Sequence, residues 1–514
     1  GRALGIDLQR IEAVSKGHHW FDGRGIPDER LRESGFDPDA PIVRLWMELT
    51  SQLISFPRHL SQHPGGFVIA KGRMAELVPV ENAAMPDRSV IQWDKDDLDA
   101  LGLLKVDILA IGMLSAIRRA LAHIAAKLGR PAFEMQDIPD GDVATYDMIC
   151  RADTVGVFQI ESRAQMSMLP RLKPRCYYDL VVEVAIVRPG PIQGGMVHPY
   201  LNNRHLADDE VDCPDELKPA LLRTKGVPIF QEQVMQIAML AADFSAGEAD
   251  ALRRAMAAWK RRGGLSPFHK RLVGRMVEKG YTHEYAERIF KQIQGFGEYG
   301  FPESHAAGFA LLAYVSSWIK CHHADAFLCG LLNAQPMGFY APAQLVRDAR
   351  EHGVVVRPVD VTISDWPSTL EEEARAPALP RWDAVHATPL RAVRLGLSRI
   401  VGMREQAAER IMTARKNGPF ASVEDLVKRA RLDAHDLNCL SGADALLTLS
   451  GRRPDAVWEA AGVDTRPTEM LRTARTTEEP FAFATPGEGA EVADDYASMG
   501  LSLRRHPLAL IRPR

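Results

Sequence analysis

One short stretch, GLLKVDILAIGM at Gly102–Met113, most constrains what this chain can fold into. Its pattern predicts a short buried strand that runs into a helix. Lys105 and Asp107 are two residues apart, so a strand places both side chains on one face, and Val106 lies on the other. Burying an unpaired charge is costly. The two charges therefore pair with each other, reach solvent at the strand edge, or hold a ligand.

Length and composition limit the class of protein. The 514 residues exceed one ordinary core and predict three or more domains, and 46% hydrophobic with 25% charged residues is typical of globular proteins. No apolar run approaches the ~20 residues that span a bilayer, and no signal peptide is present, so we expect a cytoplasmic protein without a membrane partner. Six scattered cysteines without a CxxC pair suit a reducing compartment and argue against a structural zinc site. The chain opens on glycine and stops within an apolar run, so we expect a piece of a longer protein.

Most of the remaining pattern is helical. Apolar residues recur every three or four positions in Ile42–Ile54, and the region from Ser115 to about Leu332 is mostly helical. The predicted fold class is therefore α+β and predominantly helical. Trp366–Leu390 is rich in proline and alanine and predicts a loop or irregular hairpin. The acidic stretch after Trp458 predicts a linker until Tyr496, where order resumes.

Two glycine- and proline-rich segments are candidate anion sites. The segment at 63–72 places a histidine beside a glycine pair, which favours ordinary turn chemistry over a phosphate cradle. Arg188 stands before a rigid Pro-Gly-Pro turn. An arginine in this place either binds a phosphate or carboxylate or pins the loop, and both interpretations stay open.

The most concentrated charge lies in Gly247–Met276, where eight basic residues stand against two acidic ones, giving 8 − 2 = +6. The basic residues are Arg253, Arg254, Lys260, Arg261, Arg262, Lys270, Arg271 and Arg275. On a helix, Ala249, Leu252, Met256 and Trp259 form one apolar stripe. A local +6 in a chain of net charge −4 favours a surface for an anionic ligand over a solvated basic face.

Two similar turns lie near the end of the chain. Val401-Gly402-Met403 separates two helical stretches, and Leu440-Ser441-Gly442-Ala443 repeats the design about forty residues later. Hydrophobic–x–Gly–hydrophobic turns are typical of helix-hairpin-helix units, whose backbone N–H groups bind a phosphate without reading sequence. The pair predicts DNA binding through Val401, Gly402, Met403, Ser441 and Gly442. A purely structural helical pair is the alternative.

Several segments together resemble the C-family bacterial DNA polymerases, of the DNA polymerase III alpha-subunit type. They run through nearly the whole chain in family order and are HPGGFVI, GLLKVDILAIGM, GVFQIESRAQM, VRPGPIQGGMV, IFQEQVMQIA, GEADALRRAM, YGFPESHAAGFALLAY and the two hairpins. Two segments, AAWKRRGGL and FPESHAAGFA, place the chain closest to the error-prone, damage-tolerance branch. Replicative members typically have a lysine-rich segment and an Asn-Lys pair at these places.

The resemblance implies a role for individual residues. Asp107 matches the third catalytic carboxylate of the palm, a metal ligand, and Lys105 matches the palm lysine near the reacting phosphates. Arg253 and Arg254 match the fingers arginines that hold the triphosphate, and Arg188 is a further member of this nucleotide-binding set. The loop that closes against the nucleotide is matched by Tyr299, Phe301, Ser304 and His305. The basic residues assigned to DNA binding are Lys260, Arg261 and Arg262.

The implied cofactor is Mg²⁺, because two divalent ions held by carboxylates stabilise the attacking and leaving oxygens of nucleotidyl transfer. The family's other two catalytic aspartates lie in a Pro-Asp-x-Asp motif that this sequence lacks, so we expect no polymerisation by this chain alone. The implied partners are primer–template DNA, deoxynucleoside triphosphates, and accessory mutasome proteins that link to the sliding clamp.

The implied function is error-prone, DNA-directed DNA synthesis across damage. The alternative is a non-catalytic DNA-binding scaffold that retains the polymerase fold. A helix-hairpin-helix repair nuclease is disfavoured, because no second acidic cluster resembles its metal site. The implied domains are a partial thumb (1–60), a palm segment with the third catalytic aspartate (61–112), a large helical fingers domain (113–340), a connector (341–391), a tandem helix-hairpin-helix domain (392–462), and a linker towards a truncated nucleic-acid-binding barrel (463–514).

Overall fold

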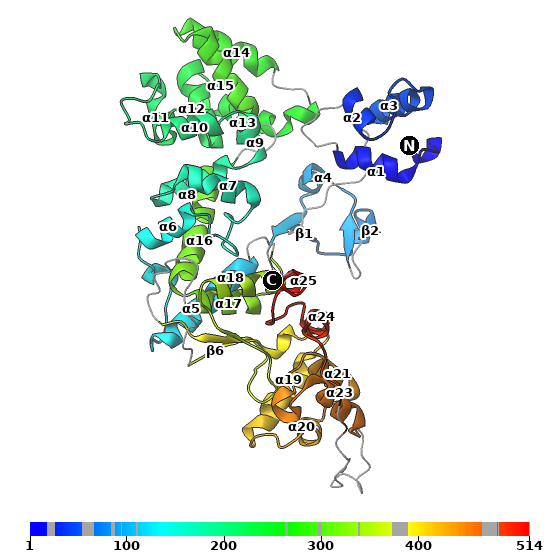
Figure 1. Ribbon diagram of the computed structural model, residues 1–514. Helices are drawn as coiled ribbons and strands as arrows, with labels where there is room; N and C mark the ends of the chain where they lie inside the picture. Colours follow the sequence, from blue (N-terminus) through cyan, green and yellow to red (C-terminus); the bar gives the residue numbers. More distant parts are fainter. Residues whose placement is uncertain are drawn as a thin grey trace. The chain divides into compact units, whose positions relative to one another are not determined.

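The computed structural model divides into two compact units, unit 1 (Gly1–Leu109) and unit 2 (Ala110–Arg514) (Figure 1). It describes residues 1–514 except 18–25, 54–65, 84–87, 94, 109–110, 263–265, 296–300, 338–339, 373–388, 465–480, 482 and 513–514. Helices dominate both units and the sheets are small, which confirms the predicted α+β, predominantly helical class. None of the described helices is long and apolar enough to cross a membrane.

Unit 1 begins with helices that share a small apolar core. They are η1 (Arg2–Leu4), α1 (Leu8–Gly17), α2 (Asp28–Glu33) and α3 (Pro41–Leu53). Helix α3 confirms the amphipathic helix predicted for Ile42–Ile54, since its Val43 and Trp46 are buried. Trp46 packs against Phe36, with ring centroids 5.3 Å apart, and both belong to this core.

The rest of unit 1 contains two short antiparallel ladders. Their elements are β1 (Gly66–Ile69), η2 (Met74–Glu76), β2 (Val80–Asn82), β3 (Ser89–Ile91), α4 (Lys95–Ala100) and β4 (Leu104–Asp107). Strand β1 pairs with β4, and β2 pairs with β3. In the first ladder, Val68 stands opposite Lys105 and Gly66 opposite Asp107. The predicted strand is therefore confirmed, and its two charged residues share one face.

The sequence predicts that strand β4 is buried, but in the structure its described side chains are not buried. Its Leu104 is 59% exposed, and the neighbouring Phe67 and Ile69 of β1 are 45% and 48% exposed. These three side chains lie on the same face, because Ile69 pairs with Leu104 and Phe67 with Val106. Within the described part of unit 1 this ladder has only two strands. Its apolar face consequently stays open to solvent.

Unit 2 begins with a large helical region built on one continuous core, which runs from Met113 to Leu501. Its elements are α5 (Ile111–Lys127), η3 (Met135–Asp137), α6 (Val143–Cys150), α7 (Arg163–Leu172), α8 (Tyr177–Ile186), α9 (Pro189–Gln193), α10 (Val197–Asn203), η4 (Asp215–Leu217), α11 (Lys218–Leu221), η5 (Leu222–Thr224), α12 (Gln231–Ala242), α13 (Ala246–Arg262), α14 (Ser266–Glu278), α15 (His283–Gly295), α16 (Glu303–His322), α17 (Ala324–Asn333) and α18 (Pro342–Glu351). Helix α5 packs closely along α17, and α16 along α8.

Helix α17 is tied to α5 by a buried ion pair. The Lys127 Nζ lies 2.8 Å from an Asp325 carboxylate oxygen, and the two side chains are 4% and 0% exposed. The same helices approach so closely that a Cβ on Gly330 would lie 2.6 Å from the Ala116 carbonyl oxygen. Close packing and a paired charge together fix the register of these two helices.

A three-stranded sheet follows α18. Its strands are β5 (Val356–Arg357), β6 (Thr369–Glu371) and β7 (Ala392–Arg394), with β7 in the middle, parallel to β5 and antiparallel to β6. The pairing of β6 with β7 agrees with the irregular hairpin predicted for Trp366–Leu390, of which 373–388 lies outside the described residues. Helix α18 also packs on α17, and its Leu345 and Val346 belong to the continuous core.

The last elements of unit 2 are again helical. They are η6 (Leu397–Arg399), α19 (Glu405–Lys416), α20 (Val423–Ala430), α21 (Ala434–Gly442), α22 (Leu447–Ser450), α23 (Arg453–Gly462), α24 (Glu488–Met499) and α25 (Pro507–Ile511). The prediction of a linker until Tyr496 is therefore wrong, because α24 begins at Glu488. Acidic residues in its first turn favour a helix start, and distant arginines pair with its carboxylates.

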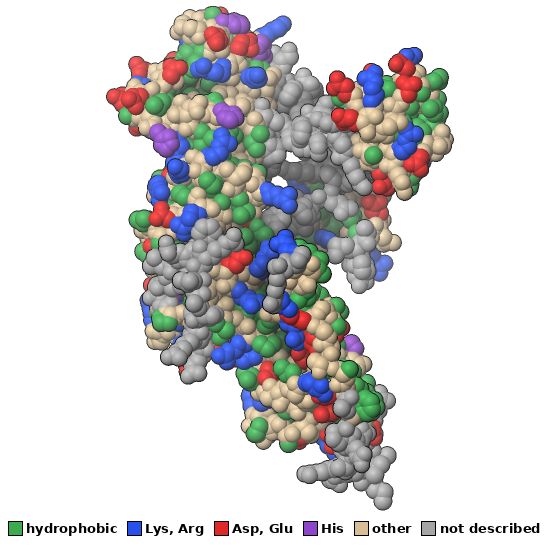
Figure 2. Space-filling view, in the orientation of Figure 1, with side chains coloured by type: hydrophobic (Ala, Val, Ile, Leu, Met, Phe, Trp, Pro, Cys, Tyr) green, Lys and Arg blue, Asp and Glu red, His purple; other side chains and the backbone are tan. Residues whose placement is uncertain are grey.

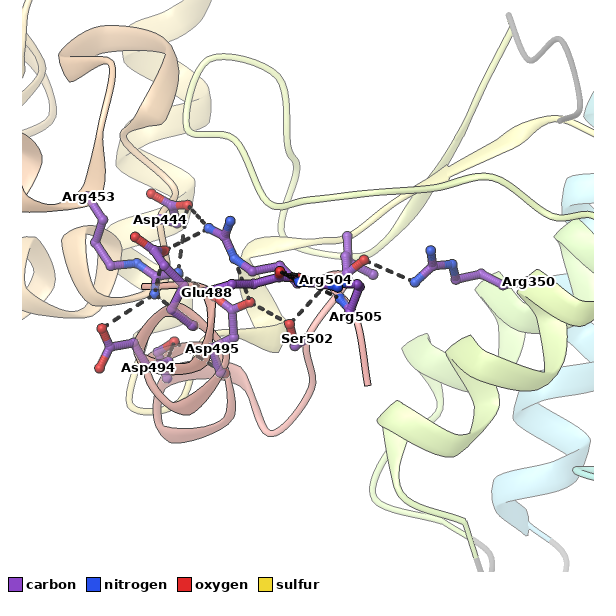
Figure 3. A network of polar contacts seen from close by, with 12 residues as sticks. Arg350, Asp444, Arg453, Glu488, Asp494, Asp495, Ser502, Arg504 and Arg505 are labelled. Carbon is purple, nitrogen blue, oxygen red and sulfur yellow. Dashed lines mark hydrogen bonds and ion pairs between the residues drawn. The ribbon is translucent and has the colours of Figure 1, made fainter. Parts of the chain in front are cut away.

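These arginines form the tail network, a set of ion pairs around α24 (Figure 3). Arg453 is 6% exposed and pairs with Asp495, while Arg504 lies 2.7 Å from Glu491 and 3.2 Å from Asp444. Its members include Arg350, Asp444, Arg453, Glu488, Glu491, Asp494, Asp495, Ser502, Leu503, Arg504 and Arg505. Contacts with the turn after α21 and with α23 thereby hold α24 in place, and Arg350 of α18 holds Leu503 just after it.

Candidate functional site

Lys105 and Asp107 are the candidate catalytic residues of unit 1. Lys105 is half-buried, and the backbone of Asp107 closes β4. Their common face is set by the register of the ladder, opposite Val68 and Gly66. The Asp107 carboxylate itself lies outside the described residues. What the structure adds is that the backbone of both residues lies in a ladder of two strands, as far as the described residues of unit 1 show.

In unit 2, the segment after Arg188 contacts the end of a later helix. This segment contains α9, which is in contact with α15. A Cβ on Gly295 would lie 2.6 Å from the Cα of Gly194 and 2.9 Å from the Gly190 carbonyl oxygen. The two backbones therefore touch where only glycine fits.

Around this contact the structure brings together three predicted nucleotide-binding residues in the Phe301 cluster, which consists of Arg188, Phe301, His305 and Phe309. The Arg188 guanidinium lies 4.0 Å from the Phe301 ring centroid, a cation–π distance, and its Nε donates to the Val184 carbonyl at 3.0 Å. The His305 ring lies 4.9 Å from that of Phe301 and 4.2 Å from that of Phe309.

The residues of the predicted closing loop differ in how far they are exposed. Phe301 is 2% exposed, whereas Ser304 and His305 are exposed. Phe301 therefore acts as the buried anchor, and the next turn presents a hydroxyl and an imidazole at the surface. Tyr299, the fourth predicted loop residue, lies outside the described residues. Arg188 thus contacts the predicted closing loop from a segment more than a hundred residues earlier.

The sequence reasoning missed Glu303, which connects this loop to three other elements. Its backbone N–H donates to Glu232, and its carboxylate contacts Tyr178 and Arg223. Partners so distant in the chain leave no local signal. The one available indication was an acidic residue directly after Pro302, where a helix N-terminus favours negative charge.

Arg253 and Arg254 lie on α13, which confirms the predicted helix, and Ala249, Leu252 and Met256 of the predicted apolar stripe are at most 1% exposed. The side chain of Trp259, the fourth residue of that stripe, lies outside the described residues. Both arginines pair with one carboxylate on their own helix. Arg253 lies 2.8 Å and Arg254 3.1 Å from Asp250. The two guanidinium groups are thereby held side by side while remaining 40% and 69% exposed.

The basic character of this region is weaker than its sequence count suggests. Arg271 pairs with Glu248 at 2.6 Å, and Arg275 pairs with Asp243 at 2.7 Å. On the face shown in Figure 2, acidic and basic side chains are interspersed over α11–α15. The side chains of Lys260, Arg261 and Arg262, the predicted DNA-binding residues of α13, lie outside the described residues.

The first predicted hairpin is present between η6 and α19. Gly402 has a φ of +80°, a left-handed conformation that suits glycine, and the helix α19 begins three residues later. The Val401 N–H donates to the Ser498 carbonyl of α24 at 2.8 Å, and Met403 is buried. The Val401 amide is thus already used within the chain, so any phosphate has to be bound by the groups that follow.

The second predicted hairpin is wrong in its position. Ser441 and Gly442 are the last two residues of α21, and Ser441 is 2% exposed. The turn comes later, at Asp444 with a φ of +58°, where the Ala445 N–H donates to the Leu440 carbonyl at 3.0 Å. The Ala445 N–H therefore closes the end of α21, and the next helix, α22, begins only at Leu447. Ser441 therefore cannot present its hydroxyl to DNA.

Two buried groups of side chains have the spacing of metal ligands but serve structural roles. Asp153, Asp348 and His352 surround the Lys320 Nζ, which lies 3.0 Å from each aspartate. Burial opposes ionisation of Asp153, but the His352 hydrogen bond and the Lys320 charge lower its pKa to about 2. Lys320 and His352 therefore already pair with both carboxylates.

The second group is Asp142, Cys321 and His322. One Asp142 oxygen accepts the Thr145 N–H at 2.8 Å and so caps α6. The same oxygen lies 2.8 Å from the His322 Nε2. This carboxylate therefore joins the start of α6 to the end of α16.

The chain matches the sequence models of three known protein domains. Residues 1–110 match the bacterial DNA polymerase III alpha NTPase domain, residues 113–280 the finger domain of the same subunit, and residues 353–456 a helix-hairpin-helix motif. The chain belongs to the bacterial DNA polymerase III alpha family. Of the Phe301 cluster, Arg188 lies inside the finger match, and the other three residues lie beyond its end at residue 280.

Individual relatives of this polymerase family match over the whole chain. Proteins named error-prone DNA polymerase are 58% identical over 515 residues in Bordetella bronchiseptica and 57% over 525 residues in Burkholderia pseudomallei. One from Methylococcus capsulatus is 55% identical over 521 residues. Each alignment covers 100% of this chain and 48–49% of the relative. The chain thus spans about half the length of these polymerases.

Proposed function

We propose that this chain is part of an error-prone, DNA-directed DNA polymerase that synthesises DNA across damage. The observation that carries the proposal is full-length coverage of the chain by relatives of that name at 55–58% identity. In these terms, 1–60 is a partial thumb, 61–112 a palm segment, 113–340 the fingers, 341–391 a connector, 392–462 the helix-hairpin-helix domain and 463–514 the approach to a further domain.

The Phe301 cluster supports a nucleotide-binding role for the fingers. Arg188 places a positive charge against the ring of Phe301, and the same loop carries Ser304 and His305, which are exposed. Arg253 and Arg254 offer two further cations on a rigid helix. Fixed cations stabilise the charge of a triphosphate during transfer. In the proposed mechanism these residues bind and orient the incoming deoxynucleoside triphosphate, and Tyr299 and Phe301 complete the loop that closes on it.

The palm segment supplies Asp107 as one ligand of a divalent ion, proposed to be Mg²⁺, and Lys105 beside the reacting phosphates. A carboxylate oxygen is the donor that Mg²⁺ prefers. When bound, a metal pair stabilises the attacking and leaving oxygens of the displacement. Such a pair needs more than one carboxylate, so this chain by itself is expected not to polymerise.

The proposed macromolecular partner is primer–template DNA. Gly402 and Met403 precede α19, whose first N–H groups suit a backbone phosphate. Lys260, Arg261 and Arg262 at the end of α13 are proposed to contact the duplex. Accessory mutasome proteins that connect to the sliding clamp are further proposed partners. The proposed location is the cytoplasm.

The decisive experiment uses the full-length protein and Asp107→Asn. This change should reduce nucleotide incorporation by at least about 10³-fold, because it removes a metal-ligand charge, while duplex binding stays within a few fold. Asp37→Asn, at an exposed aspartate of unit 1, is the matched control. Retained synthesis would refute the metal role of Asp107. A wild-type protein that binds primer–template without incorporation would instead support the non-catalytic scaffold.

A further inference from the structure

We infer that Glu303 is a positioning residue for the incoming nucleotide, because it fixes the loop that carries Phe301, Ser304 and His305. The inference rests on the proposed function, since it assigns a second layer of residues to the same site. It concerns a group that acts through its neighbours rather than one that touches the substrate.

The Glu303 carboxylate is held at both oxygens. The Tyr178 hydroxyl of α8 donates to one oxygen at 2.9 Å. The Arg223 guanidinium of η5 lies 2.8 Å from the other. Hydrogen bonds to an ionised group are roughly twice as strong as neutral ones. Each oxygen therefore has a partner on a different element, and the side chain is 21% exposed.

The backbone around Glu303 is held as well. Its N–H donates to a Glu232 carboxylate oxygen at 3.1 Å, and the Gln231 N–H donates to the Phe301 carbonyl at 3.3 Å. One turn later, the Tyr177 hydroxyl donates to the Ala307 carbonyl at 2.6 Å. The start of α16 is thereby bound to α8 and to the start of α12.

Position along the helix explains why an acidic residue suits this place. Glu303 is the first residue of α16, and Pro302 caps it with a φ of −67°, the value to which proline is restricted. A carboxylate at a helix N-terminus also interacts favourably with the helix dipole. The first turn of α16 is thus rigid before any ligand arrives.

Along this loop, the held groups come directly before the exposed groups. Glu303 and Phe301 face partners within the protein, whereas Ser304 and His305 are exposed. A rigid loop with two exposed polar groups loses little conformational freedom when it binds a phosphate, so its affinity is higher than that of a mobile loop. Loss of the Glu303 contacts should therefore weaken nucleotide binding more than it slows chemistry.

The experiment measures single-nucleotide incorporation by the full-length polymerase. Glu303→Ala should raise the KM for the nucleotide about tenfold and change kcat less than about twofold, the factor expected when ionic hydrogen bonds of this strength are lost. Glu303→Gln keeps an acceptor for Tyr178 and should recover part of the loss. Arg223→Met should reproduce the Glu303→Ala effect, and the double variant should be no worse than either single one.

Glu284→Ala is the matched control, because Glu284 is an exposed acid in the first turn of α15. An unchanged KM in folded Glu303→Ala and Arg223→Met proteins would overturn the inference. So would equal losses in all kinetic parameters together with a lower melting temperature, which indicate general destabilisation. If Glu303→Ala does not fold, Glu303→Gln and Arg223→Met carry the test. A wild-type enzyme without incorporation would defeat the proposed function instead.

Discussion

Glu183 has an unusual environment for a carboxylate. It lies in the middle of α8 with no exposed surface, and neither of its oxygens has a hydrogen-bond partner among the described residues. Burial raises the pKa of this carboxyl to about 8, and the nearby Arg204 charge only partly opposes the rise. The neutral acid is therefore the form that the core accepts at neutral pH.

Because Glu183 is buried, the free energy of unfolding should depend on pH in a specific direction. Between the ordinary pKa of 4.5 and the folded value of about 8, the folded state binds more protons than the unfolded state. The free energy of unfolding should consequently fall as pH rises through this range, by up to about 1.4 kcal/mol per pH unit. Glu183→Gln should remove that slope and be more stable than the wild type at pH 8.

Urea unfolding at several pH values between about 5 and 8.5 measures the effect. Glu278→Gln, at an exposed residue of α14, should keep the wild-type slope. A slope that survives in Glu183→Gln would show that another group is responsible.

At the scale of elements, periodic patterns predicted what local sequence controls. Helices α3 and α13 and strand β4 occur where the apolar spacing indicates, and Ala249, Leu252 and Met256 are buried as expected. Burial of a whole strand was not predictable in this way. It depends on which elements cover β4, and the spacing within the strand carries no information about them.

Contacts between residues far apart in the chain explain the remaining differences between the sequence predictions and the structure. The acidic residues of α24 have the composition of a linker, but Arg453 and Arg504 pair with them. Likewise, Ser441 and Gly442 have the sequence of a hairpin, but the helix α21 extends through them. Of the candidate site, Arg188, Phe301 and His305 come together, while the role of Glu303 depends on partners 71 to 125 residues away.

The close contact between α5 and α17 leads to a prediction about Gly330. A Cβ on Gly330 would lie 2.6 Å from a backbone oxygen of α5, which cannot move without shifting the helix. Gly330→Ala should therefore lower the free energy of unfolding by about 1–3 kcal/mol through overpacking. Thermal unfolding checks this value.

Gly274→Ala is the matched control. Gly274 lies inside α14 and is exposed, with no atom within 4 Å of the added methyl group. Alanine there should stabilise the helix by up to about 1 kcal/mol. Equal effects of the two substitutions would contradict the close approach of α5 and α17.

At the scale of the whole molecule, the tail network connects residues that are far apart in the chain. Arg350 of α18 donates to the Leu503 carbonyl at 3.0 Å, and Arg453 of α23 is almost enclosed by carboxylates of α24 and of the turn after α21 (Figure 3). The order of the last described residues therefore depends on a few arginines rather than on an apolar core alone.

Arg453→Met should leave Asp495 buried without its cation, at a cost of about 3–5 kcal/mol to the local structure. Amide hydrogen exchange should then become much faster across α24 than across α5. Arg175→Met is the matched control, because Arg175 is 56% exposed and pairs with Asp147 of α6. Unchanged protection of α24 in Arg453→Met would show that apolar packing alone holds it.

The contact between Gly194 and Gly295 has a consequence for how this molecule can change by mutation. A Cβ on Gly295 would lie 2.6 Å from the Gly194 Cα, whereas a Cβ on Gly194 would lie 3.3 Å from the Gly295 Cα. A substitution at Gly295 is therefore acceptable only after α9 and the end of α15 have moved apart. Arg188 and Phe301 each lie six residues from one of these glycines and contact each other, so that movement would disturb their contact. Two segments a hundred residues apart are thereby constrained as one unit, and mutational scanning should find Gly295 intolerant and Gly194 more tolerant.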